Sequence, residues 1–187
     1  MKILCESSVR HVHLSEKDLK ALFGGAAELV ATRDLSQPGQ FQSDKKVDLV
    51  GPKRTIEGVS VLGPTRSQTQ VEISRTDCFT LGLKDVPLRQ SGYLKDSAGI
   101  VMRVGEKEVK LVEGVIVAQR HVHMSPETAK KNDIRDGQVV SVKIDGERGG
   151  IFSNVIVRTG PSHSNAIHID SDEANALGAG SEAEIIV

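Results

Sequence analysis

One short sequence occurs twice in the chain: RHVHLS at Arg10–Ser15 and RHVHMS at Arg120–Ser125. Five of the six positions are identical, and the two copies lie 110 residues apart. In an extended strand, residues i and i+2 point to the same face, whereas in a helix they diverge by about 200°. An HxH strand therefore offers two imidazoles to one ligand, and the repeat predicts two such strands.

The duplication extends beyond this hexapeptide. In each half, alternating apolar and polar residues lead to a Gly-Pro pair, which begins at Gly63 in the first half and at Gly160 in the second. Glu72 follows nine residues after Gly63, and His168 follows eight residues after Gly160, each within a short strand-like segment. We therefore expect an internal pseudo-duplication in which each half contributes an HxH pair and one further metal-capable residue.

The two sets of candidate metal ligands are His11, His13 and Glu72 in the first half and His121, His123 and His168 in the second. Zinc uses imidazole and carboxylate ligands, and three protein ligands leave one position open for water or substrate. The same donors suit cobalt, nickel, iron or manganese, so these residues alone leave the metal open. A single HxH is as often an ordinary surface or core pair, and its repetition in one context is what favours metal binding.

Composition narrows the class of protein. The 187 residues include 24 Lys plus Arg and 25 Asp plus Glu, so the net charge is −1 and there is no basic field for nucleic acid or anionic membranes. Aromatic residues are 3% and Trp is absent, which argues against base stacking and predicts a core of Val, Ile and Leu. No apolar run of about 18 residues predicts a membrane span. Cys5 and Cys78 lack CxxC spacing and are expected to be free thiols.

Local signals favour a mainly β fold. Four segments rich in β-branched residues predict strands: 109–117, 139–144, 155–157 and 184–187. Ser15 with Asp18 three residues later predicts a capped helix start, and Ser125 followed by Pro126 predicts another. Frequent glycines between short apolar runs are typical of small antiparallel barrels or sandwiches with a few short helices.

Arg66 is the candidate anion-binding residue. It lies in the loop GPTRSQ, six residues before Glu72, and its guanidinium offers a bidentate fork for phosphate. Without Glu72 nearby, it would be interpreted as a surface arginine of a turn. Lys53 and Arg54 form a second basic spot on the turn GPKR, of the kind common at solvated hairpin tips.

Six stretches together resemble the PduL-type phosphate acyltransferases (phosphate propanoyltransferases): SVRHVHLS, SQPGQF, LVGPK, VLGPTRSQTQVEISRTDC, EGVIVAQRHVHMSPE and HIDSDEANALG. The resemblance runs from about Ser8 to Gly178. It implies transfer of a short acyl group between coenzyme A and inorganic phosphate. It also implies two small packed β-barrels with short capping helices, and two divalent metal ions, expected to be zinc.

The resemblance assigns roles to individual residues. The metal ligands it implies are the six residues named above, and Arg66 is the implied catalytic, phosphate-binding residue. The implied coenzyme A contacts are Ser7, Ser8, Val9, Lys53 and Asn175. One departure is Ser60, which stands where the family pattern has a basic residue, so one coenzyme A contact is expected to differ. The implied domains are a central barrel of residues 10–117 and a second barrel of residues 1–9 with 118–187.

Two alternative functions stay open from the residues alone. One is a zinc-dependent hydrolase of an acyl-CoA or phosphoester, and the other is a non-enzymatic metal-binding barrel. Some relatives are packaged into bacterial microcompartments through an N-terminal extension, whereas this sequence starts only ten residues before His11. We therefore expect a cytoplasmic enzyme, with microcompartment association and oligomer formation left open.

Overall fold

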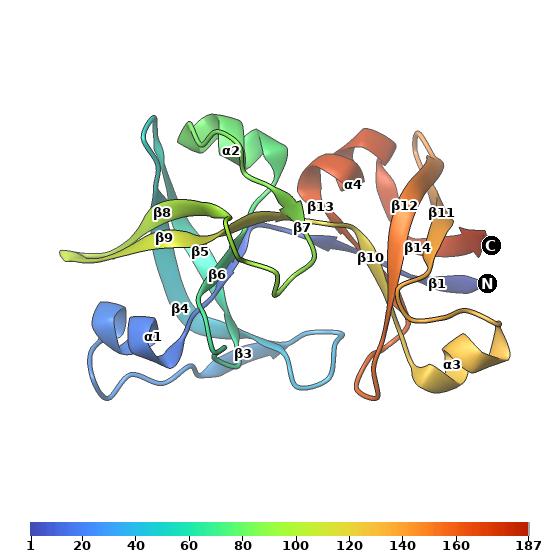
Figure 1. The fold of residues 1–187 in the computed structure, drawn as a ribbon, viewed down its shortest axis with the longest axis horizontal. Coiled ribbons are helices and arrows are strands. Elements are labelled where there is room, and N and C mark those ends of the chain that lie inside the picture. The colour runs from blue at the N-terminus through green and yellow to red at the C-terminus, as the bar shows by residue number, and fades with distance from the viewer. Residues whose placement is uncertain (187) are drawn as a thin grey trace. The chain divides into compact units, whose positions relative to one another are not determined.

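The computed structural model describes residues 1–186 and confirms a mainly β fold. Within that range, fourteen strands and four short helices follow one another along the chain (Figure 1). The strands are β1 (Lys2–Ser8), β2 (His11–His13), β3 (Ala31–Asp34), β4 (Phe41–Val50), β5 (Thr55–Gly63), β6 (Gln70–Glu72), β7 (Leu88–Arg89), β8 (Ala98–Val104), β9 (Lys107–Ala118), β10 (His121–Met124), β11 (Val139–Gly146), β12 (Gly150–Thr159), β13 (Ala166–Asp170) and β14 (Ala179–Ile186). The helices are α1 (Glu16–Phe23), α2 (Arg75–Leu81), α3 (Pro126–Lys131) and α4 (Ser171–Leu177). None of the helices that residues 1–186 form has the length and apolar character that crossing a membrane requires.

The predicted strands fall inside observed strands. Segments 109–117, 139–144 and 155–157 lie in β9, β11 and β12. Segment 184–187 lies in β14 as far as Ile186, and Val187 lies outside the described residues.

Both predicted helix starts are confirmed, and one differs in detail. Ser125 caps α3, with Pro126 at the first helical position. Ser15 caps α1 by accepting the backbone N–H of Asp18 at 3.1 Å. Its own backbone N–H donates to Thr69 Oγ1 at 2.8 Å, and Thr69 in turn donates to the Asp18 carboxylate. The capping box of this helix therefore closes through Thr69 rather than directly.

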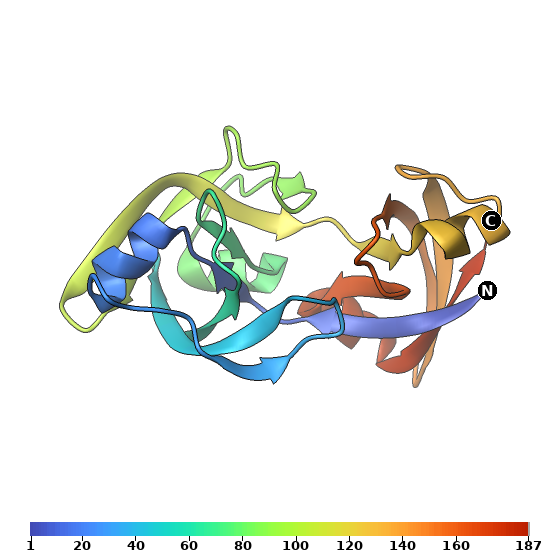
Figure 2. The ribbon, with the colours of Figure 1, turned by 90° about the horizontal axis from the view of Figure 1, so that it is seen from below.

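One ring of strands closes in the central unit. Its order is β4-β5-β2-β6-β9-β8, and the ring closes because β8 pairs with both β9 and β4. β3 extends the sheet beside β4, and β7 pairs with β9. α1 packs against the hairpin of β8 and β9 through its buried Leu19 and Leu22 (Figure 2). The core of this ring consists mainly of Val, Leu and Ile, as the composition predicts.

A second ring closes in the other unit, in the order β1-β13-β10-β12-β11-β14. α4 follows β13 directly and contacts β1, β11 and β14. The core of the second ring also consists mainly of Val and Ile, with Met124 among the fully buried side chains.

The two rings repeat one another strand by strand. β2 pairs parallel to β5 and antiparallel to β6, and β10 pairs in the same senses with β12 and β13. β9 lies parallel to β6 and antiparallel to β8, and β1 lies in the same way beside β13 and β14. Along the chain, however, β1 precedes β2 and β9 precedes β10. Each half of the duplication therefore gives its first strand to the ring of the other half.

The chain divides into two compact units: Met1–Val9 with Ser36–Pro38 and Gln119–Val187, and Arg10–Leu35 with Gly39–Ala118. The boundaries expected from the sequence stay a prediction, and they differ from this division at Ser36–Pro38 and at Ala118. That short loop groups with the second ring because Ser164 Oγ donates to the Ser36 carbonyl at 2.8 Å.

Candidate metal centre and phosphate site

In the central unit, β2 carries His11 and His13, and β6 places Glu72 directly opposite His11. The alternation of the strand buries Val12 completely in the core and leaves both imidazoles on the other face. Nε2 of His11 lies 3.5 Å from Oε2 of Glu72. Within residues 1–186, His11, His13 and Glu72 are the one group of metal-capable side chains whose ligand atoms all lie within 4.8 Å of one another. The fold thus brings together the three ligands predicted for the first half.

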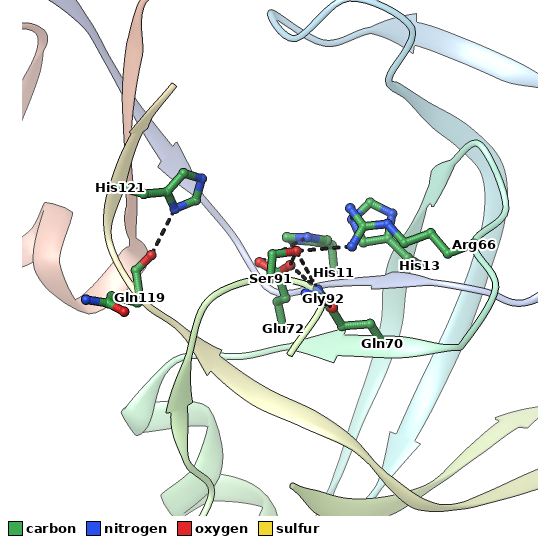
Figure 3. A network of polar contacts seen from close by, with 9 residues as sticks. All are labelled: His11, His13, Arg66, Gln70, Glu72, Ser91, Gly92, Gln119 and His121. Atoms are coloured by element: carbon green, nitrogen blue, oxygen red, sulfur yellow. Dashed lines mark hydrogen bonds and ion pairs between the residues drawn. The ribbon is translucent and has the colours of Figure 1, made fainter. Parts of the chain in front are cut away.

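Glu72 is held by two further side chains (Figure 3). Ser91 Oγ donates to Oε1 of Glu72 at 2.9 Å, and the side-chain amide of Gln70 donates to the same oxygen. The amide oxygen of Gln70 accepts the backbone N–H of Gly92 at 2.8 Å. These bonds fasten the loop that follows β7 to the carboxylate of the cluster.

Arg66 reaches the same cluster from the loop between β5 and β6 (Figure 3). Its Nη2 lies 2.9 Å from Nε2 of His13, and its Nη1 donates to Ser91 Oγ at 3.1 Å. The Arg66 backbone N–H donates to the carbonyl of Leu14 at 2.9 Å, which holds the loop beside β2. Because a guanidinium only donates, this contact uses the lone pair of His13 on Nε2, which is the same lone pair that a metal bound at Nε2 would take. A permanent cation therefore lies in direct contact with the candidate metal ligands.

The protonation states of His13 and Glu72 suit metal binding. Burial lowers the pKa of His13 to about 3, and the charges of His11 and Arg66 act in the same direction. Burial by itself raises the pKa of Glu72, but the charge and hydrogen bond of His11 and the hydrogen bond of Ser91 hold that pKa well below its usual range. At neutral pH, His13 is therefore neutral and Glu72 is ionised, as ligands of a divalent metal must be.

The second ring repeats the arrangement with an imidazole in place of the carboxylate. β10 carries His121 and His123, and β13 places His168 opposite His121. The ring centroids of His121 and His123 are 4.6 Å apart, and that of His168 lies 5.3 Å and 4.9 Å from them. Nδ1 of His121 donates to the carbonyl of Gln119 at 2.8 Å, which leaves the lone pair of the neutral ring on Nε2 (Figure 3). The three rings lie together, although their nitrogens are less closely gathered than the ligand atoms of the first group.

A fourth histidine adjoins this second cluster. The ring of His163 stacks on that of His123, with centroids 4.1 Å apart and an interplanar angle of 18°. Its Nδ1 donates to the carbonyl of Arg158 at 2.9 Å. A Cβ atom at Gly160 would lie 2.9 Å from the His163 ring, so the glycine makes this close packing possible. From the loop GPSHSN, a solvated or hydrogen-bonding role is expected for His163; the structure shows the hydrogen bond, and the stack on His123 does not follow from the sequence.

A carboxylate also lies at the second cluster. Glu6 on β1 pairs in register with His168, and its Oε2 lies 3.6 Å from His168 Nε2. The side-chain nitrogen of Gln37 lies 3.3 Å from the same ring nitrogen. In the first ring, the position equivalent to Glu6 is Ile116, which pairs with Glu72. Each cluster therefore contains one carboxylate, contributed by a different strand of the ring.

Two buried nitrogen atoms test whether these residues fit the metal ions that the motif implies. Among residues 1–186, the buried side-chain nitrogen and oxygen atoms without a hydrogen-bond partner are Nδ1 of His13 and Nδ1 of His123. They occupy the same position in the two copies of the motif. Burial lowers the pKa of His123 to about 2, so this imidazole is neutral too. An unpartnered buried polar group costs about 1–3 kcal/mol, and the imidazole and carboxylate donors at both clusters fit zinc.

Four of the five predicted coenzyme A contacts belong to the unit that contains the second ring. Ser7 and Ser8 end β1 and pair with residues of β13 just before α4. Val9 follows with 56% of its surface exposed, and Asn175 is exposed on α4. These side chains are accessible to a ligand.

The fifth predicted contact, Lys53, lies in the central unit on the turn between β4 and β5. Its Nζ lies 4.2 Å from the centroid of the Phe79 ring on α2, and 74% of Phe79 is exposed. The Lys53 backbone N–H donates to the carbonyl of Leu81 at 2.9 Å, so the end of α2 positions the turn. Lys53 therefore presents its charge on an exposed aromatic ring.

Sequence reasoning missed several neighbours of the site. Gln70 precedes Glu72 by two residues, so the strand period could have placed both on one face. Ser91 carries no comparable signal because a loop distant in sequence brings it to Glu72. Glu6 depends in the same way on the parallel pairing of β1 with β13.

Two closed barrels, each with an HxH strand at a cluster of metal-capable side chains, define a duplicated barrel protein with an arginine in contact with one cluster. The profile of the phosphate propanoyltransferase family matches residues 4–180. The phosphate propanoyltransferase of Sebaldella termitidis is 48% identical over 177 residues, which cover 95% of this chain and 83% of that relative. Those of Clostridioides difficile and Thermotoga maritima are each 46% identical, over 97% and 93% of this chain and 87% and 83% of the relatives.

The chain therefore belongs to the phosphate propanoyltransferase family. These relatives support phosphate acyltransferase activity, and hence a transferase enzyme, for this protein.

Proposed function

We propose that this protein moves a short acyl group between coenzyme A and inorganic phosphate at two divalent metal ions, with zinc as the expected metal. The observation that carries the proposal is the contact of Arg66 with the cluster of His11, His13 and Glu72. A metal cluster alone suits hydrolysis or a structural role. A bidentate cation at its edge is the group that phosphate requires.

In the proposed reaction, a phosphate oxygen attacks the thioester carbonyl carbon of acyl-CoA. The new C–O bond forms the acyl phosphate, the C–S bond breaks, and the electron pair leaves with the sulfur of coenzyme A. When bound, a divalent metal supplies Lewis-acid polarisation of an oxygen and a template for the two substrates. No side chain of the described site is an activated nucleophile, which favours direct transfer between bound substrates.

Arg66 would neutralise and orient the phosphate. Ser91 holds the guanidinium at Nη1 and donates to Glu72, so one hydroxyl links the anion-binding group to a metal ligand. Such preorganised groups contribute because they need no rearrangement when charge develops. The proposed metal ligands are His11, His13 and Glu72 at one ion and His121, His123 and His168 at the other.

Coenzyme A binding is proposed for Ser7, Ser8, Val9, Lys53 and Asn175. The Lys53 ammonium suits the phosphate groups of coenzyme A, and its exposed position leaves it accessible. The association of this protein with a microcompartment, its oligomeric state and a cytoplasmic location stay predictions.

The test is release of free thiol from acetyl-CoA and propanoyl-CoA, with and without phosphate, before and after chelation and zinc addition. The transferase predicts release that depends on phosphate, stops on chelation and returns with Zn²⁺. Release without phosphate would identify the hydrolase instead. Stoichiometric metal without turnover would identify a non-enzymatic barrel.

A further inference from the structure

The arginine that opens each RHVH motif pairs with a helix carboxylate in both halves, and Arg120 also donates Nε and Nη2 to the carbonyl of Ser153. Nε and Nη2 of Arg10 each lie 2.8 Å from Oδ1 of Asp77, the third residue of α2. Nη1 of Arg120 lies 2.6 Å from Oε1 of Glu173, the third residue of α4. The motif thus repeats not only its histidines but also an ion pair to the helix that follows the strand of the third proposed ligand.

The second carboxylate oxygen continues the connection in each half. Oδ2 of Asp77 accepts the backbone N–H of Ser74 at 3.1 Å, and Ser74 is the N-cap of α2. Oε2 of Glu173 accepts the backbone N–H of Asp170 at 3.0 Å, and Asp170 is the N-cap of α4. The side chains of Ser74 and Asp170 in turn accept the backbone N–H of Asp77 and of Glu173, which completes a capping box at each helix.

These caps lie close to the proposed metal ligands. Ser74 follows Glu72 by two residues, and Asp170 follows His168 by two residues. Arg10 and Arg120 each immediately precede the first histidine of their HxH pair. Each arginine therefore links the strand that carries two proposed ligands to the end of the strand that carries the third.

The strand ladders that carry the proposed ligands are short, so a further link between the two strands helps to fix the distance between them. β2 and β6 pair over three residues, and the pair His11 with Glu72 is the last of that ladder. The pair His121 with His168 ends the ladder of β10 and β13 in the same way. One residue beyond each pair, the arginine binds the carboxylate at N3 of the following helix and so links the two strands.

We infer that Arg10 and Arg120 are positioning residues, each of which sets the separation of the proposed metal ligands in its own ring. This inference rests on the proposed metal centre and extends it to residues that contact neither metal nor substrate. Groups that orient metal ligands in this way typically contribute 10–100-fold to metal affinity. Each arginine acts within one ring, so its loss affects one of the two ions.

The test measures the Zn²⁺ dissociation constant of each site by competition with a chromophoric chelator. In the His123→Ala background, only the first site remains, and Arg10→Ala is expected to weaken Zn²⁺ binding about 10–100-fold whereas Arg120→Ala has no effect. In the His13→Ala background, the two arginine substitutions exchange their effects. Arg10→Lys is expected to recover part of the affinity because it keeps the charge but not the two-nitrogen contact with Asp77.

The matched control is Arg103→Ala, which removes an arginine paired with Glu108 on the exposed part of the β8-β9 hairpin. Asp77 is buried, so Arg10→Ala leaves a buried carboxylate without its cation. In the second ring, the double variant Arg120→Gln/Glu173→Gln removes both charges together and is therefore a milder change. Circular dichroism checks that the variants fold. Unchanged site-specific Zn²⁺ affinity in folded variants at either arginine overturns the inference alone. A wild-type protein that binds no Zn²⁺ overturns the proposed metal centre and the inference with it.

Discussion

Nη2 of Arg66 lies 2.9 Å from Nε2 of His13, so the proposed phosphate-binding group and a proposed metal ligand share one contact. The two residues come from different segments, one from β2 and the other from the loop after β5. The contact fixes the position of the guanidinium beside the imidazole, whereas phosphate binding and metal binding are expected to respond separately to substitution.

Arg66→Ala is expected to reduce kcat/KM for phosphate about 100–1,000-fold, because it removes a positioned charge from the site. Arg66→Lys should retain the charge but lose the bidentate fork, and so fall between the variant and the wild type. Initial rates at varied phosphate and fixed propanoyl-CoA measure the effect. Metal content, determined in parallel, should stay within twofold of wild type, and unaltered phosphate kinetics in Arg66→Ala would remove this residue from the mechanism.

Ser91→Ala is expected to lower kcat/KM for phosphate about 10–100-fold. The variant removes the donor to Glu72 and the acceptor of Arg66, and hydrogen bonds to charged groups contribute about 1.5–3 kcal/mol. The control is Ser162→Ala, at an exposed serine of the other unit. Equal rates for the two variants would show that Ser91 has no part in arranging the site.

His163 is expected to support His123 through its ring rather than through its nitrogens. His163→Phe keeps an aromatic ring for the stack and should leave the Zn²⁺ affinity of the second site within about threefold. His163→Ala removes the stack and should weaken that affinity about tenfold. Chelator competition in the His13→Ala background measures both. An equal loss in the two variants would instead make His163 a ligand.

The metal-free protein is expected to lose stability as the pH falls below about 6.5. The His13 pKa is 6.5 in the unfolded chain and about 3 in the folded protein, so below pH 6.5 the unfolded state binds a proton that the folded state does not. Stability therefore falls from pH 6.5 towards pH 3, by about 2 kcal/mol at pH 5 from this histidine alone.

Urea unfolding of the chelated protein at pH 7, 6 and 5 measures this loss. The chelated His13→Asn variant provides the comparison, because asparagine does not titrate. If the two proteins lose stability in parallel over this range, His13 is not the group responsible.

The sequence predicts the local parts of this site better than its long-range parts. The HxH pairs and the third proposed ligand of each set follow from strand periodicity and from the repeated order of motifs. Arg66 follows from its spacing to Glu72, and the structure brings it to His13. The stacked His163 and the carboxylate of Glu6 do not follow, because each depends on which strands and loops pair across the ring.

The fold class follows from glycine-rich turns and β-branched runs, whereas the assignment of the first strand to the second barrel is implied by the family resemblance alone. Periodicity assigns residues to strands, and it carries no information on which strands pair. The two first strands have the same neighbours in their rings, so a local pattern cannot distinguish an exchange from two self-contained barrels.

The exchanged first strands make the halves dependent on each other for closure. A fragment of residues 1–106 would contain every strand of the central ring except β9, and would leave β6 and β8 with open edges. It would also carry β1 without β13 and β14 to pair with. Open edges recruit other chains, so two copies of such a fragment could complete one another by trading strands. In this chain the strand exchange takes place within one polypeptide, so the double barrel has the topology of a domain-swapped dimer whose two halves are covalently joined.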